Sequence, residues 1–182
     1  MRSDMKLYDN TDYICKKGYS RLWMIRRLKS LGANRSEMLD VFFKQIRSVL
    51  ELAVPVWQPG LTLLEVKQIK TVQKTAFYVI LGEEYKNYEN SLQVLKAEKL
   101  KDRRYTLCLN FANKSLKHPK HQHWFSENTI DPNPPPPPKT RAGKEKAKAP
   151  AKLPKFKPVK ARTDRYKDSP IPYLTKLLND DS

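Results

Sequence analysis

Adjacent carboxylates are the residues from which metal-dependent phosphoryl chemistry would have to be built in this sequence. Two such pairs are present, Glu83-Glu84 and Asp180-Asp181. Polymerases and nucleases hold two divalent metals with clustered carboxylates on a rigid element. The first pair follows an expected helix end and the second lies close to the last residue, and neither has a third carboxylate at a useful spacing. We interpret both pairs as solvated surface charge and expect no catalytic residue among them.

A second candidate for chemistry is the histidine cluster His118, His121 and His123, with Cys108 upstream. Structural zinc sites combine paired ligands such as C-x2-C and H-x3-5-H, and this cluster lacks a second cysteine within range. We interpret it as a polar helix exit followed by a loop. A Gly-rich phosphate loop and a nucleophile turn are also missing from the sequence. We therefore expect no metal, no cofactor and no enzymatic activity of the chain by itself.

Basic residues at helical spacing point instead to binding. Lys and Arg neutralise phosphates, and aromatic side chains stack on unpaired bases. The alternative is that a lysine-rich helix face is only solvated and that the tryptophan belongs to the core. The expected nucleic-acid-binding residues lie in three groups: Lys16, Trp23 and Arg27 in one helix; Lys67, Lys70 and Lys74 in another; and the neighbours Arg103 and Arg104 in a third.

The overall charge favours a polyanionic partner. The 182 residues carry 36 Lys and Arg against 19 Asp and Glu, a net charge of +17. RNA or DNA bound without sequence specificity fits that excess best. We expect no membrane association, because no run of about 20 apolar residues is present. The N-terminus lacks a signal-peptide core and the two cysteines lie far apart, so we expect an intracellular protein, in the nucleus or the cytoplasm.

Apolar periodicity predicts helices throughout the first 125 residues. One helix is expected from Asp12 to Leu31, with Gly32 as its stop. A second begins at Asn34 in a capping box with Glu37, and Pro55 ends or kinks it. Its expected inward stripe consists of Leu39, Phe43, Ile46, Leu50 and Ala53.

The later helices are predicted by the same signals. After a Pro59-Gly60 turn, a capping box of Thr62 and Glu65 begins a third helix that ends at Gly82. Its expected inward residues are Val66, Ile69, Val72, Ala76 and Ile80. A short helix over Tyr88–Leu95 and a longer one over Glu98–Lys117 follow. Alternation of period two is absent, so the fold class is all-α, a small bundle of about four to five helices.

Composition divides the chain into three parts. Residues 1–125 hold the apolar and aromatic content and form the expected helical domain. Nine of the 14 prolines lie between Asp131 and Arg162, including the run Pro134 to Pro138. A lysine-rich segment of this kind buries too little apolar surface to offset its ordering entropy, so residues 126–162 are expected to be a disordered linker. Its basic residues 139–162 suit a nuclear import signal or an RNA tether. Residues 163–182 are expected to form a short extended segment with one helical turn.

Several phrases, read in order, resemble the region that follows the polymerase domain in jockey-like non-LTR retrotransposon reverse transcriptases. The resemblance covers residues 10–125 and 162–180. Its phrases are DYICKKGYSRLWMIRRLKSLGA, FFKQIRSVLELAVPVWQPGL, IKTVQKTAFYVILG, KLKDRRYTLCLNFANKSLKHPKHQHWF and RTDRYKDSPIPYLTKLLND. The residues that carry it are Arg47, Ser48, Leu50, Glu51, Pro55, Trp57, Gln73, Lys74, Ala76, Gly82, Arg103 and Arg104.

The resemblance implies thumb and post-thumb helices that lie beside the primer and template of an RNA-directed DNA polymerase. The catalytic palm of that family, with its aromatic-Ala-Asp-Asp signature, is expected upstream of Met1. We therefore expect a fragment of a transposable element that contacts nucleic acid and does not catalyse.

Two alternatives stay open. One is a helical protein-interaction module that docks on the absent palm or on another protein, with Trp57 and the segment Ile171 to Leu174 as contacts. The other is a genomic relic without a present function.

Overall fold

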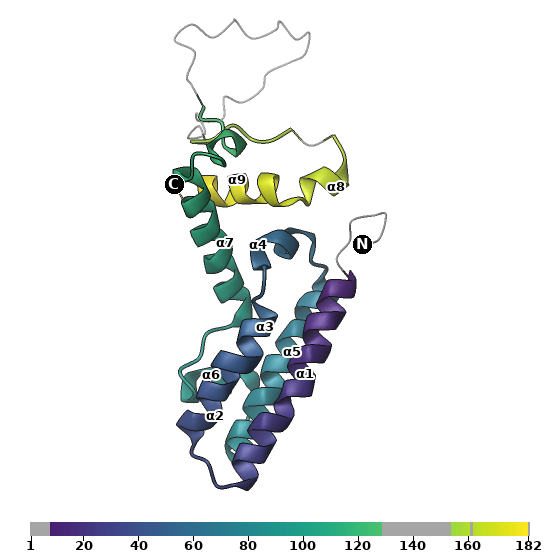
Figure 1. Ribbon diagram of the computed structural model, residues 1–182, viewed down its shortest axis with the longest axis vertical. Coiled ribbons are helices and arrows are strands. Elements are labelled where there is room, and N and C mark those ends of the chain that lie inside the picture. Colours follow the sequence, from purple (N-terminus) through teal and green to yellow (C-terminus); the bar gives the residue numbers. More distant parts are fainter. Residues whose placement is uncertain (1–7, 129–153, 161, 182) are drawn as a thin grey trace, which may run out of the picture.

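The computed structural model describes residues 8–128, 154–160 and 162–181. Within these ranges the chain is all-α, as expected, apart from an isolated antiparallel bridge between Glu127 and Phe156. The α-helices are more numerous than the four to five expected (Figure 1). They are α1 (Tyr8–Ser30), α2 (Arg35–Val41), α3 (Ser48–Leu50), α4 (Val54–Trp57), α5 (Leu63–Leu81), α6 (Tyr88–Val94), α7 (Leu100–Lys117), α8 (Asp164–Lys167) and α9 (Pro170–Asp180).

Short helical turns of other types join these helices. A π-helical turn, η1 (Phe42–Arg47), joins α2 to α3, and the 3-10 turns are η2 (Gln58–Gly60), η3 (Gly82–Glu84) and η4 (Gln122–Trp124). No described helix is long and apolar enough to cross a membrane.

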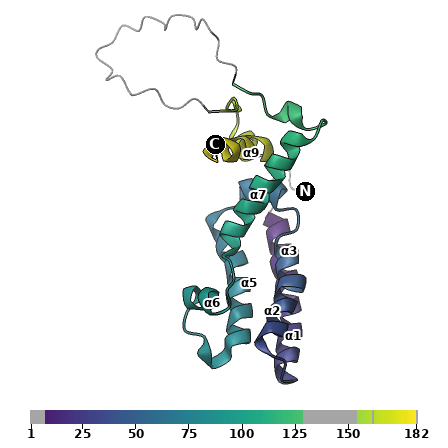
Figure 2. The ribbon, with the colours of Figure 1, turned by 90° about the vertical axis from the view of Figure 1, so that its left-hand side faces the viewer.

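Three elements form the larger part of the core, which we call the three-helix unit: α1, the continuous rod α2–η1–α3, and α5. They lie side by side along the long axis of the molecule (Figures 1 and 2). Phe42 of the rod and Phe77 of α5 are both fully buried, with ring centroids 5.1 Å apart in an edge-to-face arrangement. Such ring pairs add to the stabilisation that burial of the two side chains already provides.

The capping signals of the sequence are confirmed. Asn34 and Glu37 form a reciprocal capping box at the start of α2, and Thr62 and Glu65 form one at the start of α5. Each box satisfies helix-terminal amides that have no partner within the helix. The expected helix ends at Gly32 and Gly82 are also confirmed, since both glycines adopt positive φ angles of 77° and 59°.

The inward stripe of the rod differs from the expected one. Leu39 and Phe43 are half-buried and Ala53 is exposed, whereas the buried residues follow a spacing of four: Met38, Phe42, Ile46, Leu50 and Val54. A strict spacing of four drifts around an α-helix of 3.6 residues per turn. A π-helical turn contains more residues per turn than an α-helix, and it keeps Phe42 and Ile46 on one side.

The end of the rod is also reached earlier than expected. α3 ends at Leu50, and Ala53 adopts a left-handed conformation with φ 53°. Pro55 lies in the first turn of the next helix, α4, where a proline is tolerated because no intrahelical hydrogen bond is lost. It therefore helps to begin a helix instead of ending one.

A second region, the C-terminal cap, lies at the C-terminal end of α7 (Figures 1 and 2). It consists of residues 122–128, 154–160 and 162–181. α9 packs across α7 and α4, and Leu174 is fully buried there. The expected single helical turn in residues 163–182 is therefore wrong, because α9 alone extends over 11 residues.

The expected linker 126–162 is ordered at both flanks, although residues 129–153 lie outside the described ranges. Phe156 is 3 % exposed and contacts the Phe125 ring at a centroid distance of 6.2 Å. The amide of Phe156 donates to Oδ1 of Asn179 (2.8 Å), and Nδ2 of Asn179 donates to the carbonyl of Phe156 (3.1 Å). A basic, proline-rich flank was expected to be solvated, but one phenylalanine anchors it.

Candidate nucleic-acid interface

The predicted residues of α1 lie on one exposed face of that helix. Lys16, Trp23 and Arg27 are all exposed, and Trp23 is 59 % exposed. The spacing of seven and four residues places them within about 40° of one another around the helix axis. The alternative that Trp23 belongs to the core is therefore wrong. A tryptophan that stays this exposed, with a cation on either side, is an unusual surface feature.

The predicted lysines of α5 are exposed as well, but they do not all face the same direction. Lys67 and Lys74 are separated by two turns of the helix and lie on its outermost face. Lys70 lies to one side, where its ammonium group is 4.3 Å from the centre of the Tyr88 ring. Lys70 thus faces α6, whereas Lys67 and Lys74 face outward.

A shallow groove of about 290 Å³ lies between α1 and α5. Lys16 and Tyr19 of α1 lie on one side of it, and Gln68 and Thr71 of α5 lie on the other. Lys67 precedes Gln68 along α5 but does not line the groove, so Lys16 is the cation among its lining residues. Asp12 also lines it and lowers the local positive charge.

Tyr19 was not among the predicted residues, although the sequence contained its signal. It is three residues after Lys16 and four before Trp23, which places it on the same helix face. Its side chain is 41 % exposed. Tyr13, further toward the start of α1, accepts a hydrogen bond from Lys17 (2.8 Å), which lowers the pKa of its phenol from the ordinary value of 10.0. Tyr19 therefore extends the face of Lys16, Trp23 and Arg27, whereas Tyr13 lies about 80° around the helix from Trp23.

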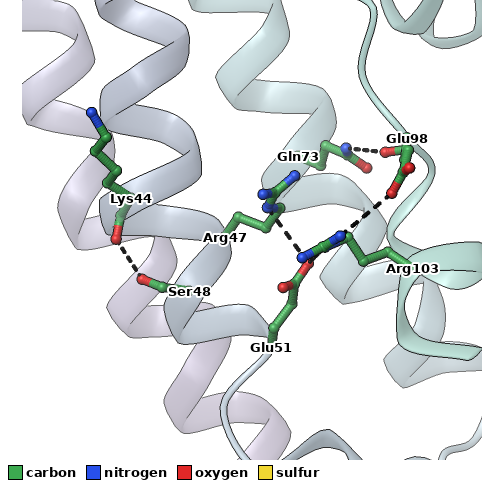
Figure 3. Close-up of polar contacts among 7 residues, drawn as sticks. All are labelled: Lys44, Arg47, Ser48, Glu51, Gln73, Glu98 and Arg103. Atoms are coloured by element: carbon green, nitrogen blue, oxygen red, sulfur yellow. Dashed lines mark hydrogen bonds and ion pairs between the residues drawn. The ribbon is translucent and has the colours of Figure 1, made fainter. Parts of the chain in front are cut away.

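Arg103, in contrast, is engaged inside the protein. Its guanidinium bonds the carboxylate of Glu51 (2.9 Å) and approaches that of Glu98 (3.7 Å). Arg47 also pairs with Glu51 (3.6 Å), so one carboxylate joins the end of α3 to the start of α7 (Figure 3). The prediction that Arg103 is available to phosphates is not supported by this arrangement.

Arg104 is buried, with only 1 % of its surface exposed. Its Nε donates to Oε1 of Gln58 at 2.8 Å. Loss of solvation lowers the pKa of this guanidinium from the ordinary value of 12.5. Arg104 therefore cannot lie on an open helix face that tracks a nucleic-acid backbone, which corrects the sequence interpretation of the Arg103-Arg104 pair.

The histidines form an aromatic stack. The rings of His118 and His121 are 4.6 Å apart, and those of His121 and Trp124 are 4.3 Å apart, both in stacked geometry. α7 ends one residue before His118, as the interpretation of a polar helix exit required. Within residues 8–128, 154–160 and 162–181, no group of three or more His, Cys, Asp or Glu side chains could hold a metal ion.

The carboxylate pairs lie at the surface. Glu83 is exposed, and Glu84 forms an ion pair with Arg35 (2.7 Å) that links η3 to α2. Asp180 and Asp181 are exposed at the end of α9. These positions agree with the interpretation of both pairs as surface charge.

Most of the residues that carry the resembling phrases quoted above are buried or form ion pairs within the protein. Leu50, Trp57 and Ala76 are buried in the core. The amide nitrogen of the buried Gln73 donates to the carbonyl of Glu98 (3.0 Å), and its oxygen accepts from the hydroxyl of Tyr88 (2.7 Å). These phrases therefore encode mainly how α3, α5, α6 and α7 meet (Figure 3). Comparison of the chain with protein-family models, with curated proteins and with solved structures finds no match.

Proposed function

We propose that this protein binds single-stranded nucleic acid, RNA or DNA, on the face formed by α1 and α5, without catalysing a reaction on it. The observation that supports the proposal best is the exposed Trp23 between Lys16 and Arg27, with Lys67 and Lys74 exposed on the neighbouring helix α5. Lysines on two packed helices present phosphate-binding charge at fixed positions, and an exposed indole offers a stacking platform to an unpaired base. The net charge of +17 adds long-range attraction.

Salt dependence tests the electrostatic part of this proposal. We expect the affinity for a fluorescent single-stranded 20-mer, measured by anisotropy, to fall steeply between about 50 and 200 mM salt. The triple variant Lys16→Gln, Lys67→Gln, Lys74→Gln should lower the slope of log K against log salt by about 0.7 for each lysine that contacts a phosphate. Binding that ignores salt would contradict the proposal.

A control with the same charge change separates specific placement from general charge. Lys44, Lys114 and Lys117 are exposed and lie on η1 and α7, away from the groove. Their triple replacement by glutamine should lower the affinity only slightly. An equal loss in both triple variants would show that the α1–α5 face has no special role.

Stacking is tested at Trp23. Replacing Trp23 by alanine should cost about 1–3 kcal/mol of binding free energy, since that is the usual contribution of one aromatic–base stack. The stability of the fold should change little, because the indole is 59 % exposed. Tyr105→Ala is the matched control, as Tyr105 is 41 % exposed on α7 outside this face. An unchanged affinity of the Trp23→Ala variant would contradict the stacking role.

The relation to a retrotransposon reverse transcriptase is part of the proposal and rests on the order of the resembling phrases. On this view the helices would lie beside the primer and template of a polymerase whose palm is a separate segment. The chain alone should give no primer extension with Mg²⁺ and deoxynucleotides. Mapping the transcript and reading the frame upstream of Met1 tests the relation directly: a palm with paired aspartates supports it, and its absence contradicts it.

An apolar groove favours a second candidate function, a protein-interaction module. The groove has a volume of about 560 Å³ and is lined by Pro55, Val56, Phe111, Trp124 and Ile171, among others, at the junction of α4, α7 and α9. Trp57, an expected contact, is 3 % exposed and donates to the carbonyl of Leu52 (2.6 Å), so that expectation is wrong. Light scattering discriminates: an unfilled docking surface should promote self-association, and a monodisperse monomer counts against it.

A further inference from the structure

A recessed pocket of about 250 Å³ lies between α5, α6 and the start of α7. Four cations line it, Lys70, Lys99, Lys101 and Arg104, together with one carboxylate, Glu89. The three lysines are exposed at its rim, and Arg104 is 1 % exposed at its base. The pocket is therefore strongly positive and deepest at a guanidinium.

Arg104 forms no ion pair with a carboxylate in the part of the protein that the structure describes, although Glu51 attracts it at longer range. Its Nε donates a hydrogen bond to the neutral side chain of Gln58. Glu51, the closest source of negative charge on the rod, is already shared by Arg47 and Arg103. Buried charges are normally paired, because removal from water is costly without a counter-ion. The lowered pKa of Arg104 reflects the same cost.

The start of α7 adds to the positive potential. Lys99 is the N-cap of this 18-residue helix and gives it no side-chain cap, and Leu100 and Lys101 of the first turn line the pocket. The free amides of a helix N-terminus and its dipole favour an anion. Glu89 opposes this at the rim, where it pairs with Lys99 (2.9 Å). An incoming dianion would compete with Glu89 for that lysine.

From this geometry we propose that the pocket binds a phosphate dianion in the form of a terminal phosphomonoester. A guanidinium without a carboxylate partner can match two oxygens of one phosphate in a bidentate contact. A phosphodiester within a strand carries substituents on two oxygens, so it cannot reach a buried guanidinium as a terminal phosphate can. The inference rests on the proposed function in one respect, since the phosphate is taken to be the end of a bound strand.

The position of the pocket fits this role. On α5, Gln68 and Thr71 border the groove shared with α1, whereas Val66 and Lys70 border the pocket. Successive residues of a helix are 100° apart, so Lys67 and Lys74 lie between the two concavities. A strand held by these lysines can therefore place its end at Arg104.

The first arm of the test uses free ligands. Titration of the whole chain with inorganic phosphate and with a nucleoside 5′-monophosphate, at constant ionic strength and followed by amide NMR shifts, should move the signals of Leu100, Lys101 and Lys70. Sulfate at the same ionic strength is a second oxyanion and chloride is the control. Absence of any shift with either phosphate probe overturns the proposal.

The second arm compares 12-mers of one sequence with a 5′-phosphate, a 3′-phosphate or hydroxyls at both ends. One terminal phosphate should raise the affinity roughly tenfold, as two charge-assisted hydrogen bonds permit. Arg104→Met should abolish that difference, Lys101→Gln should reduce it, and Lys114→Gln on the same helix should leave it unchanged. Equal affinities of all three oligonucleotides overturn the proposal while leaving the nucleic-acid-binding function intact.

The two proposals can fail separately. If no oligonucleotide binds but inorganic phosphate still shifts the pocket amides, the nucleic-acid function fails and the pocket is a site for a free phosphate group. If Arg104→Met does not fold, as judged by circular dichroism, Lys101→Gln and Lys99→Gln decide the matter, because both lysines are exposed. An unchanged effect of the terminal phosphate in both of these variants overturns the proposal.

Discussion

The three-helix unit and the C-terminal cap are stabilised in different ways. In the three-helix unit, helices of up to 23 residues pack full-length against one another, and their core residues recur at helical spacing. The cap is joined by a few contacts between segments that are distant in the sequence, such as Phe125 with Phe156 and Phe156 with Asn179. Periodic burial distributes stability over many side chains in that unit and also where α9 packs on α7, whereas the segments 126–128 and 154–160 of the cap depend on single anchors.

The largest expected effect is on the stability of the three-helix unit itself. Phe77→Ala removes a fully buried ring that contacts Phe42 and should destabilise the fold by about 3–5 kcal/mol. Urea unfolding followed by circular dichroism at 222 nm measures this loss. Phe111→Ala, a ring removed at the partly exposed groove, is the control and should cost much less. Similar losses in both variants would show that the core of the three-helix unit contributes no more stability than the partly exposed groove on α7.

The next effect concerns the junction between the three-helix unit and the start of α7, the helix that leads to the cap. Glu51→Gln removes the carboxylate that joins Arg47 to Arg103, and it leaves two partly buried guanidiniums facing each other (Figure 3). We expect a loss of roughly 2–3 kcal/mol, below that for a fully buried pair. Asp40→Asn is the matched control, because the Asp40–Lys44 pair is exposed and such pairs contribute about 0–1 kcal/mol. Equal losses in the two variants would contradict the structural role of Glu51.

A smaller and more local effect is expected in the cap. Asn179→Ala removes both hydrogen bonds to the backbone of Phe156, at a cost of about 1–3 kcal/mol. Hydrogen exchange should accelerate at Phe156 and Lys157 and stay unchanged in α1 and α5, because the cap is held by few contacts. Uniform acceleration throughout the chain would show that the cap and the three-helix unit unfold together.

The smallest expected change at neutral pH concerns the two thiols. Burial raises the pKa of Cys15 and of Cys108 from the ordinary value of 9.0 to about 11. At pH 8 the thiolate fraction, and with it the rate of reaction with a disulfide reagent, should be about a hundredfold below that of the unfolded chain. Folding raises these pKa values, so the protonated thiols favour the folded state. Their contribution to the free energy of unfolding is present below pH 9 and is lost as the pH rises through 11. Fast labelling of the folded protein at pH 8 would contradict this burial.

Local chemistry explains which features could be predicted. The capping boxes at Asn34 and Thr62 and the stops at Gly32 and Gly82 involve residues within one turn of each other, so their outcome depends little on the rest of the fold. In the stripe of the rod, Ile46 and Leu50 were predicted correctly and the other three positions are off by one residue, since its turns were assumed to be regular α-helix. The fate of Arg103 and Arg104 could not be predicted from spacing, because it depends on Glu51 and Gln58, which lie some 50 residues away.

The sequence by itself determined the helical class, the capped helix ends and the placement of Lys16, Trp23 and Arg27 on one side of a helix, because each depends on residues within one helix. Only the tertiary structure decided which cations are free and which are enclosed. It turned Arg103 into part of an ion-pair cluster, placed Arg104 at the base of a pocket and attached Phe156 to the cap. The physical reason is that pairing and burial depend on contacts between distant segments, which composition and spacing do not encode.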